Sequence, residues 1–151
     1  IDLGVTSSAT LGPLAKTSAK YTVKYPRLLN TRILVVEDNL LIQEFIPDVM
    51  GHEGILVDLA NNGVEALALL ANNEYAAVLM DCQMPIMDGF ETTKRIRANP
   101  RFDTLPIIAM SGNVNEKDRQ RCLDCGMNGF ISKPVDWEQA FLTLDHWIGI
   151  E

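Results

Sequence analysis

Acidic, hydroxyl and amine side chains follow four separate apolar runs in this sequence. They are Glu37 with Asp38, Asp81, Ser111 and Lys133. Carboxylate oxygens suit Mg²⁺, which shares its coordination shell with phosphate groups, and a carboxylate can also act as a nucleophile that forms an aspartyl phosphate. A lysine and a hydroxyl could then stabilise the charge that develops on the phosphoryl oxygens. The set therefore predicts a Mg²⁺-dependent phosphoryl-transfer site.

The apolar runs ahead of these residues predict the elements that hold them. Continuous apolar runs bounded by turn signals are typical of strands buried on both faces. In an open α/β sheet, ligands bind beyond the carboxyl ends of the strands. The acids, the hydroxyl and the amine are therefore expected at one edge of a parallel sheet. The runs cover residues 33–36, 76–80, 107–110 and 130–131.

Strand and helix patterns alternate from Asn30 to the end of the chain. One more strand is expected at 55–59, before the turn at 61–63. Five strand–helix units in a row predict an α/β fold with a doubly wound, five-stranded parallel sheet. The expected helices run from about 40 to 50, from 64 to 71, from 88 to 99, from 113–116 to 126, and from 136 onward.

The first expected helix carries Leu41, Phe45 and Val49 four residues apart, which predicts that this apolar stripe packs on the sheet. Pro47 falls inside the same helix, where it should remove a backbone hydrogen bond and bend the helix. In the fourth expected helix, Asn113 and Glu116 give the pattern of a helix start.

Length and composition indicate one folded domain behind a linker or tail. Residues 1–29 are rich in Ser, Thr, Ala and Lys and are interpreted as that linker, ahead of a domain at 30–151. No apolar run approaches the roughly 18 residues of a membrane span, so no membrane contact is expected for this segment. The domain carries nine cations and 19 acids, a balance that excludes nucleic acid as an expected partner. Because the chain begins at Ile1, it is interpreted as a fragment or a processed product.

The three cysteines indicate a reducing compartment. An odd number of thiols without a disulfide framework favours the cytoplasm, and that location is expected here. Cys122 and Cys125 have the spacing of a redox or zinc pair, but no second Cys/His pair with ligand spacing exists. They also fall late in an expected helix, whereas redox pairs sit at helix starts. Cys82, Cys122 and Cys125 are therefore interpreted as structural.

Four separated motifs resemble those of the response-regulator receiver domain, the CheY-like family. They extend over about 120 residues, from Arg32 to the end, in the order typical of that family. The resemblance implies a flavodoxin-like (βα)5 fold with strand order 2-1-3-4-5, whose cleft lies between strands one and three. The motifs are Val35-Val36-Glu37-Asp38-Asn39, Met80-Asp81-Cys82-Gln83-Met84-Pro85-Ile86-Met87-Asp88-Gly89, Met110-Ser111-Gly112 and Lys133-Pro134.

The resemblance also implies a role for each acid. Asp81 would accept the phosphoryl group. Asp38, Asp81 and the main-chain carbonyl of Gln83 would hold Mg²⁺ as the cofactor, and Glu37 would contact the ion through water.

Switching would involve three further residues in the same resemblance. Ser111 would supply the switch hydroxyl, Lys133 would contact the phosphoryl group, and Phe130, 19 residues after Ser111, would change rotamer as the aromatic switch. The peptide between Lys133 and Pro134 would be cis.

The partner that the resemblance implies is a histidine kinase or a histidine phosphotransfer domain. It would dock over the start of the first helix and the loop after the last strand, at Asn39, Ile42, Phe45 and Pro134. Ile42 is expected at the rim of the helix, because the predicted stripe turns Leu41 inward.

The motifs look most like receivers of hybrid histidine kinases, so the chain is expected to be the C-terminal receiver of such a kinase in a phosphorelay. An isolated receiver would assist only its own phosphorylation and dephosphorylation. One alternative is a Mg²⁺-dependent phosphohydrolase with Asp81 as nucleophile, although haloacid-dehalogenase-like enzymes carry an acid where this chain has Gln83. The other is a receiver-like interaction module that is never phosphorylated, although such modules usually lose an acid or the lysine.

Overall fold

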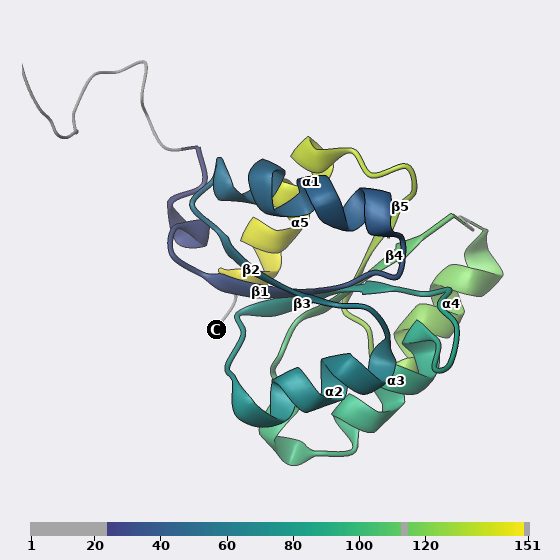
Figure 1. The fold of residues 1–151 in the computed structure, drawn as a ribbon. Coiled ribbons are helices and arrows are strands. Elements are labelled where there is room, and N and C mark those ends of the chain that lie inside the picture. Colours follow the sequence, from purple (N-terminus) through teal and green to yellow (C-terminus); the bar gives the residue numbers. More distant parts are fainter. Residues whose placement is uncertain (1–23, 113–114, 150–151) are drawn as a thin grey trace, which may run out of the picture.

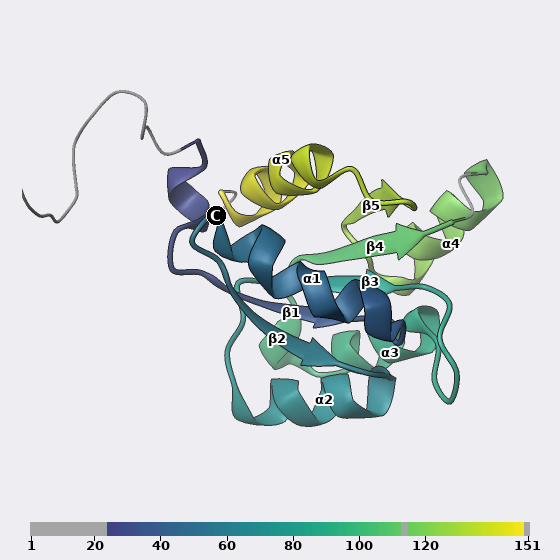
Figure 2. The same cartoon turned by 45° about the horizontal axis from the view of Figure 1, so that its top comes forward.

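Five parallel strands form the centre of the fold, in the order β2-β1-β3-β4-β5 (Figure 1). The computed structural model describes residues 24–112 and 115–149. All strand arrows point to the same side of the molecule, so the carboxyl ends of the strands share one edge (Figure 2). This is the α/β fold and strand order expected from the sequence. The strands are β1 (Arg32–Val36), β2 (Leu56–Ala60), β3 (Ala77–Asp81), β4 (Ile107–Ser111) and β5 (Gly129–Ser132).

Helices cover both faces of the sheet. Figure 1 shows α1 and α5 over one face, and α2 and α3 over the other, with α4 beside them. None of the helices in the described part of the chain has the length and apolar character that a membrane crossing requires. The helices are α1 (Leu40–Gly51), α2 (Gly63–Asn72), α3 (Gly89–Arg97), α4 (Glu116–Cys125) and α5 (Trp137–Ile148), with short 3-10 turns η2 (Pro26–Leu28) and η3 (Pro100–Phe102).

Alternate residues of the central strands supply two separate cores. In β1, Ile33 and Val35 pack with α1 and α5, whereas Leu34 and Val36 pack with α2, α3 and α4. All four side chains are fully buried. A strand whose residues point alternately into two cores must be apolar at every position. This explains the continuous apolar runs in the sequence. The same alternation holds the register that brings the site residues to one edge.

Polar side chains start the helices close to where the sequence placed them. The Asp88 carboxylate accepts the backbone N–H of Glu91 and caps α3, and Asp136 caps α5 in the same way. The cap of α4 is Asn115, whose side chain accepts the N–H of Asp118. The expected opening residue Asn113 lies outside the described residues. Gly126 ends α4 with a φ of 111°, in the left-handed region that favours glycine.

The predicted apolar stripe of α1 is wrong by one residue. Leu41 is 74% exposed and Phe45 is 44% exposed, whereas Ile46 and Met50 are fully buried. Ile42 is half-buried and packs against the core beside Ile46. Because residues 40–42 are all apolar, two stripes with the same four-residue spacing fit the sequence, and the tertiary packing selects the second. Pro47 lies inside this helix, as expected.

Residues ahead of the expected domain boundary are part of the packed structure. Tyr25 is 5% exposed and Leu28 is fully buried, and both belong to the core under α1 and α5. The expected boundary at residue 30 therefore cuts through folded chain, because Tyr25 and Leu28 bury apolar surface that a linker would leave in water. We call residues 24–29 the N-terminal arm. The part of the expected linker before Lys24 lies outside the described residues.

Candidate functional site

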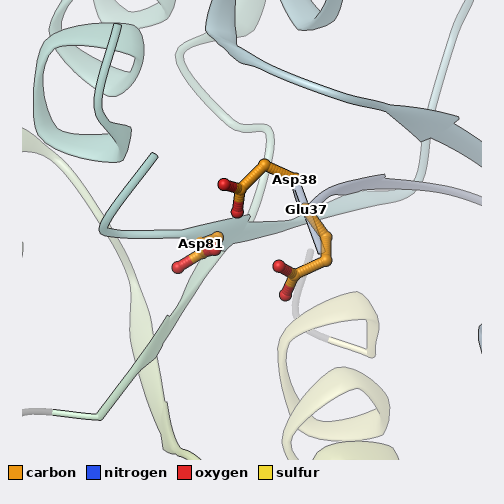
Figure 3. A group of neighbouring side chains, drawn as sticks. All are labelled: Glu37, Asp38 and Asp81. Atoms are coloured by element: carbon orange, nitrogen blue, oxygen red, sulfur yellow. The ribbon is translucent and has the colours of Figure 1, made fainter. Parts of the chain in front are cut away.

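Three acids meet at the carboxyl ends of β1 and β3, the two neighbouring strands between which the strand order reverses. Glu37 and Asp38 directly follow β1, and Asp81 is the last residue of the neighbouring β3. One carboxylate oxygen from each lies within 4.8 Å of the others (Figure 3). Helices leave these two strands toward opposite faces of the sheet, which opens a crevice at this point. The crevice is therefore lined by carboxylates, the ligands that hard cations such as Mg²⁺ prefer.

Lys133 supplies a cation that contacts two of these acids. Its Nζ lies 3.1 Å from Oδ1 of Asp81 and 3.3 Å from Oε1 of Glu37. Burial alone would lower the pKa of Lys133, but the two carboxylates more than offset this and hold the pKa above its ordinary value. The lysine is therefore protonated at neutral pH and can face an anion at Asp81.

Glu37 and Asp38 occupy different environments although they are adjacent. Glu37 is 1% exposed; its Oε2 accepts the backbone N–H of Asn39 at 3.1 Å, and its Oε1 faces Lys133. Burial raises the pKa of Glu37, and the neighbouring Asp81 raises it further. The Asp38 side chain is exposed. Of the two, Asp38 is thus the better placed to bind a hydrated cation directly.

Ser111 lies on β4, which is next to β3, and Phe130 lies on β5, at the edge of the sheet beyond β4. Ser111 is the last residue of β4, is 4% exposed, and accepts the backbone N–H of Lys133 through its carbonyl at 2.8 Å. This hydrogen bond fixes the start of the β5–α5 loop beside the acids. Phe130 in β5 is half-buried, and the Arg119 guanidinium lies 5.2 Å from its ring centroid. The Lys133–Pro134 peptide is cis, as the resemblance implied.

The loop between β3 and α3 is closed tightly over Asp81. The backbone N–H of Gln83 donates to Oδ1 of Asp81 at 3.1 Å, and the N–H of Gly89 donates to the carbonyl of Cys82 at 3.2 Å. A Cβ at Gly89 would lie 2.3 Å from the carbonyl oxygen of Asp81. Only glycine allows the two backbone segments to approach so closely. Gly89 was part of the sequence motif, but the close backbone contact that requires a glycine there is seen only in the structure.

A small apolar hollow of 210 Å³ lies beside the acids, between α1 and the start of α5. Three of the four expected docking residues, Ile42, Phe45 and Pro134, line it. The fourth, Asn39, is exposed and caps α1 by accepting the N–H groups of Leu41 and Ile42. Because three of the expected docking residues line it, we call this hollow the docking groove. Two of its residues, Val135 and Trp137, were not anticipated, although their position directly after Pro134 points to the same loop.

The cysteines are buried and free. Cys82 and Cys122 have their sulfur atoms 3.9 Å apart, and the thiol of Cys125 donates to the carbonyl of Cys122. Burial raises the pKa of each thiol, which disfavours the reactive thiolate. This environment agrees with their interpretation as structural residues.

Comparison with known proteins identifies the family. Residues 33–144 match the family model of the response regulator receiver domain. The chain therefore belongs to this family, the receiver domains of two-component phosphorelays. It is 42% identical over 112 residues to the sensor histidine kinase RcsC of Escherichia coli K12, and 38% identical over 124 residues to hybrid signal transduction histidine kinase B of Dictyostelium discoideum. These alignments cover 74% and 75% of the chain, but only 12% and 6% of the relatives.

Solved structures give the same result. The receiver domain of sensor histidine kinase PA1611 from Pseudomonas aeruginosa PAO1, which has a magnesium ion in its active site cleft, is 36% identical with a TM-score of 0.74. That similarity covers 80% of this chain and 99% of the other. The receiver domain of Ssk1 from Saccharomyces cerevisiae, crystallised with the phosphotransfer protein Ypd1, was also found. That match is 25% identical, has a TM-score of 0.74, and covers 80% of this chain and 90% of the other.

The different environments of the two adjacent acids predict different effects on metal binding. Asp38→Ala is expected to weaken Mg²⁺ affinity on the order of 100-fold, because it removes a charge and the carboxylate that we expect to bind the ion directly. Glu37→Gln is expected to weaken it only about tenfold, the lower end for a residue that acts through the surrounding shell. Calorimetric titration measures both affinities, with Asp48→Ala, an exposed acid of α1, as the matched control. The reverse order would show that Glu37 is the direct ligand.

Proposed function

We propose that Asp81 is the phosphoacceptor of this receiver domain and takes the phosphoryl group from a phosphohistidine of a partner. An oxygen of the Asp81 carboxylate attacks phosphorus, the phosphorus–nitrogen bond breaks, and the imidazole nitrogen leaves with the bonding electron pair and takes up a proton. The observation that supports this most directly is the Lys133 ammonium, 3.1 Å from Asp81 Oδ1 within a cluster that contains two further acids. A cation and two further carboxylates around a third carboxylate fit an anionic group held there with a metal ion.

Each neighbour of Asp81 has a distinct role in this proposal. Asp38, Asp81 and the main-chain carbonyl of Gln83 hold Mg²⁺, with Glu37 acting through water. Bound there, Mg²⁺ supplies positive charge to the phosphoryl oxygens. Lys133 pairs with an oxygen of the transferred group.

Beyond the chemical step, the proposal includes a response to phosphorylation. The hydroxyl of Ser111 donates a hydrogen bond to a phosphoryl oxygen, which draws the end of β4 toward Asp81. Phe130, one strand away and half-buried under Arg119, then changes its rotamer population. Ligand-dependent repacking of this kind requires the phosphorylated state to favour one of two arrangements of the same side chains.

The similar proteins suggest which larger protein this domain belongs to and which partner it binds. We infer that the chain is the receiver of a hybrid histidine kinase in the cytoplasm, where its three cysteines remain free thiols. Its partner is then a histidine kinase or a histidine phosphotransfer domain, since the Ssk1 receiver was crystallised with such a protein. The acidic balance of residues 30–151 argues against a nucleic acid partner.

The function can be tested with the 151-residue chain. With Mg²⁺ and acetyl phosphate, intact-mass spectrometry should show a gain of one phosphoryl group. A histidine-phosphorylated phosphotransfer domain, chosen from a panel as the fastest donor to the wild-type chain, should label the same residue. Steady release of phosphate from a phosphoester substrate, with no phosphorylated protein, would instead support the phosphohydrolase. No labelling by any donor would support the unphosphorylated interaction module.

We further propose that the docking groove receives the histidine-bearing helix of the partner. Apolar anchors within a rim of polar groups are typical of such interfaces, and Phe45 is the most exposed aromatic side chain of the groove. Phe45→Asp is expected to slow transfer from the phosphohistidine donor at least about tenfold, equivalent to 1.4 kcal/mol. Acetyl phosphate is a small donor that does not dock in the groove. Its rate of labelling of Phe45→Asp should therefore equal that of the wild type and serves as the reference.

The matched control for this change is Leu123→Asp. Leu123 is an exposed apolar residue of α4, outside the groove, with 57% of its surface accessible. It should leave transfer from the phosphohistidine donor unchanged. Equal slowing by Phe45→Asp and Leu123→Asp would move the docking site away from the groove.

A further inference from the structure

The N-terminal arm is fastened to α5 at several points. The Tyr25 hydroxyl donates to Oε2 of Glu138 at 3.0 Å, and Lys24 forms an ion pair with the same carboxylate. The arm is also held by Arg27, whose Nη2 lies 2.7 Å from Oδ2 of Asp145. Glu138 follows Trp137, the first residue of α5, so the arm binds the same helical turn that lines the docking groove.

Four aromatic rings, each in contact with the next, extend from the arm to the groove. The ring of Tyr25 lies 5.9 Å from that of Phe141, which lies 6.2 Å from the ring of Trp137. Trp137 in turn meets Phe45 edge to face, with centroids 6.3 Å apart. All of these separations fall in the range of attractive aromatic pairs. We call this set the aromatic row; it begins in the arm and ends in the groove.

We propose that Tyr25 is a positioning residue for the docking groove: seated on Phe141, it holds Trp137 and Phe45 in the arrangement that the partner recognises. The inference rests on the proposed role of the groove. It adds that the segment entering the domain controls how well the partner binds.

The physical reason lies in how the two ends of the row are packed. Tyr25 and Phe141 are buried, whereas Trp137 is half-buried and Phe45 is exposed. Burial therefore restrains the two outer rings less than the two inner rings. Removal of the Tyr25 ring opens space beside Phe141, and the rotamers of Trp137 and Phe45 become less restricted. A partner must then order these side chains on binding, which weakens its affinity without a change at the acids.

The test measures transfer to Tyr25→Leu from the phosphohistidine donor described above, with the receiver concentration varied. The expected result is at least a fivefold rise in the apparent KM of transfer, with kcat and acetyl phosphate labelling unchanged. NMR signals of the Trp137 indole and the Phe45 ring should shift in the same variant. Tyr25→Phe keeps the ring and loses only the hydroxyl, so it should restore KM to within twofold of the wild type.

Tyr75→Leu is the matched control. Tyr75 is half-buried and, like Tyr25, donates its hydroxyl to a carboxylate, that of Asp58, at 2.6 Å, but it packs against the other core. It should lower thermal stability while leaving KM unchanged. If Tyr25→Leu does not remain folded at the assay temperature, Tyr25→Met is measured in its place. Methionine fills more of the space beside Phe141 than leucine but has no ring, and this change should raise KM at least twofold.

An unchanged KM in Tyr25→Leu, or an equal rise in Tyr75→Leu, would overturn the inference. For the substitute variant, an unchanged KM in Tyr25→Met would do the same. These outcomes are separate from failure of the proposed function. If Phe45→Asp slows transfer and Tyr25→Leu does not raise KM, the groove binds the partner and only the role of the arm is wrong. If Phe45→Asp itself has no effect, the groove is not the docking site.

Discussion

Asp81→Asn is expected to abolish phosphorylation by acetyl phosphate. The amide has nearly the shape of the carboxylate, so the loop over residue 81 should stay closed, but an amide is neither an anionic ligand nor an adequate nucleophile. Loss of the negative charge also leaves Lys133 without one of its two carboxylate partners. Intact-mass spectrometry should show no gained phosphoryl group under conditions that label the wild-type chain completely.

Two comparisons make this result specific. Asp58→Asn changes an acid of β2 that binds Tyr75 and Arg32, remote from the cluster of acids, and should leave labelling at the wild-type level. A melting curve of Asp81→Asn should show a folded protein. Labelling of Asp81→Asn equal to the wild type would assign phosphorylation to another residue, and peptide mapping would locate it.

Gly89→Ala is expected to be the most damaging single-methyl change near the site. The added Cβ would lie 2.3 Å from the Asp81 carbonyl oxygen and 2.9 Å from the Cα of Cys82. Both contacts are with backbone, which cannot rotate away, so the loop must shift. Overpacking of this kind costs about 1–3 kcal/mol, and we expect a value of about 3 kcal/mol here. Because the shift begins at Asp81, acetyl phosphate labelling should also slow, by at least about tenfold.

Gly112→Ala provides the comparison within the same region. Gly112 follows Ser111, and a Cβ there would meet nothing within 4 Å. Its stability and labelling rate should match the wild type. Denaturant unfolding and timed mass spectrometry measure the two quantities. A Gly89→Ala protein with wild-type stability would mean that the β3–α3 loop accommodates the methyl group by moving freely, and that its closure over Asp81 is loose.

The sequence predicted most of the architecture because strands that are buried on both faces appear in it as continuous apolar runs. The runs before Asp38, Asp81, Ser111 and Lys133 became four adjacent strands, and the residues after them meet at one edge. Strand β2 begins and ends one residue later than expected. As an edge strand, it is less buried, and Leu56 is 58% exposed, so the apolar pattern does not define its ends sharply.

Other features depend on tertiary contacts that no local pattern encodes. The sequence could not determine which side of α1 packs on the sheet. Residues 40–42 are all apolar, so two different apolar stripes fit the helix equally well. The arm was assigned to a linker because residues 1–29 are rich in Ser, Thr, Ala and Lys. Its packing involves Phe141, more than 100 residues away in the sequence. Trp137 was not anticipated, since its contact with Phe45 depends on the packing of α1 against α5.

The two separate cores have a consequence for how such a domain can diversify. The docking groove and its aromatic row are supported by the core under α1 and α5, whereas Phe130 packs on the core under α2, α3 and α4. The sheet separates the core beside the proposed donor site from the core on which the proposed switch residue packs. Substitutions in the two cores are separated by the sheet, so their effects on the free energy of unfolding should add. Under the proposed function, donor specificity and the response to phosphorylation should therefore be separable by mutation, whereas the acids at the edge of the sheet serve both.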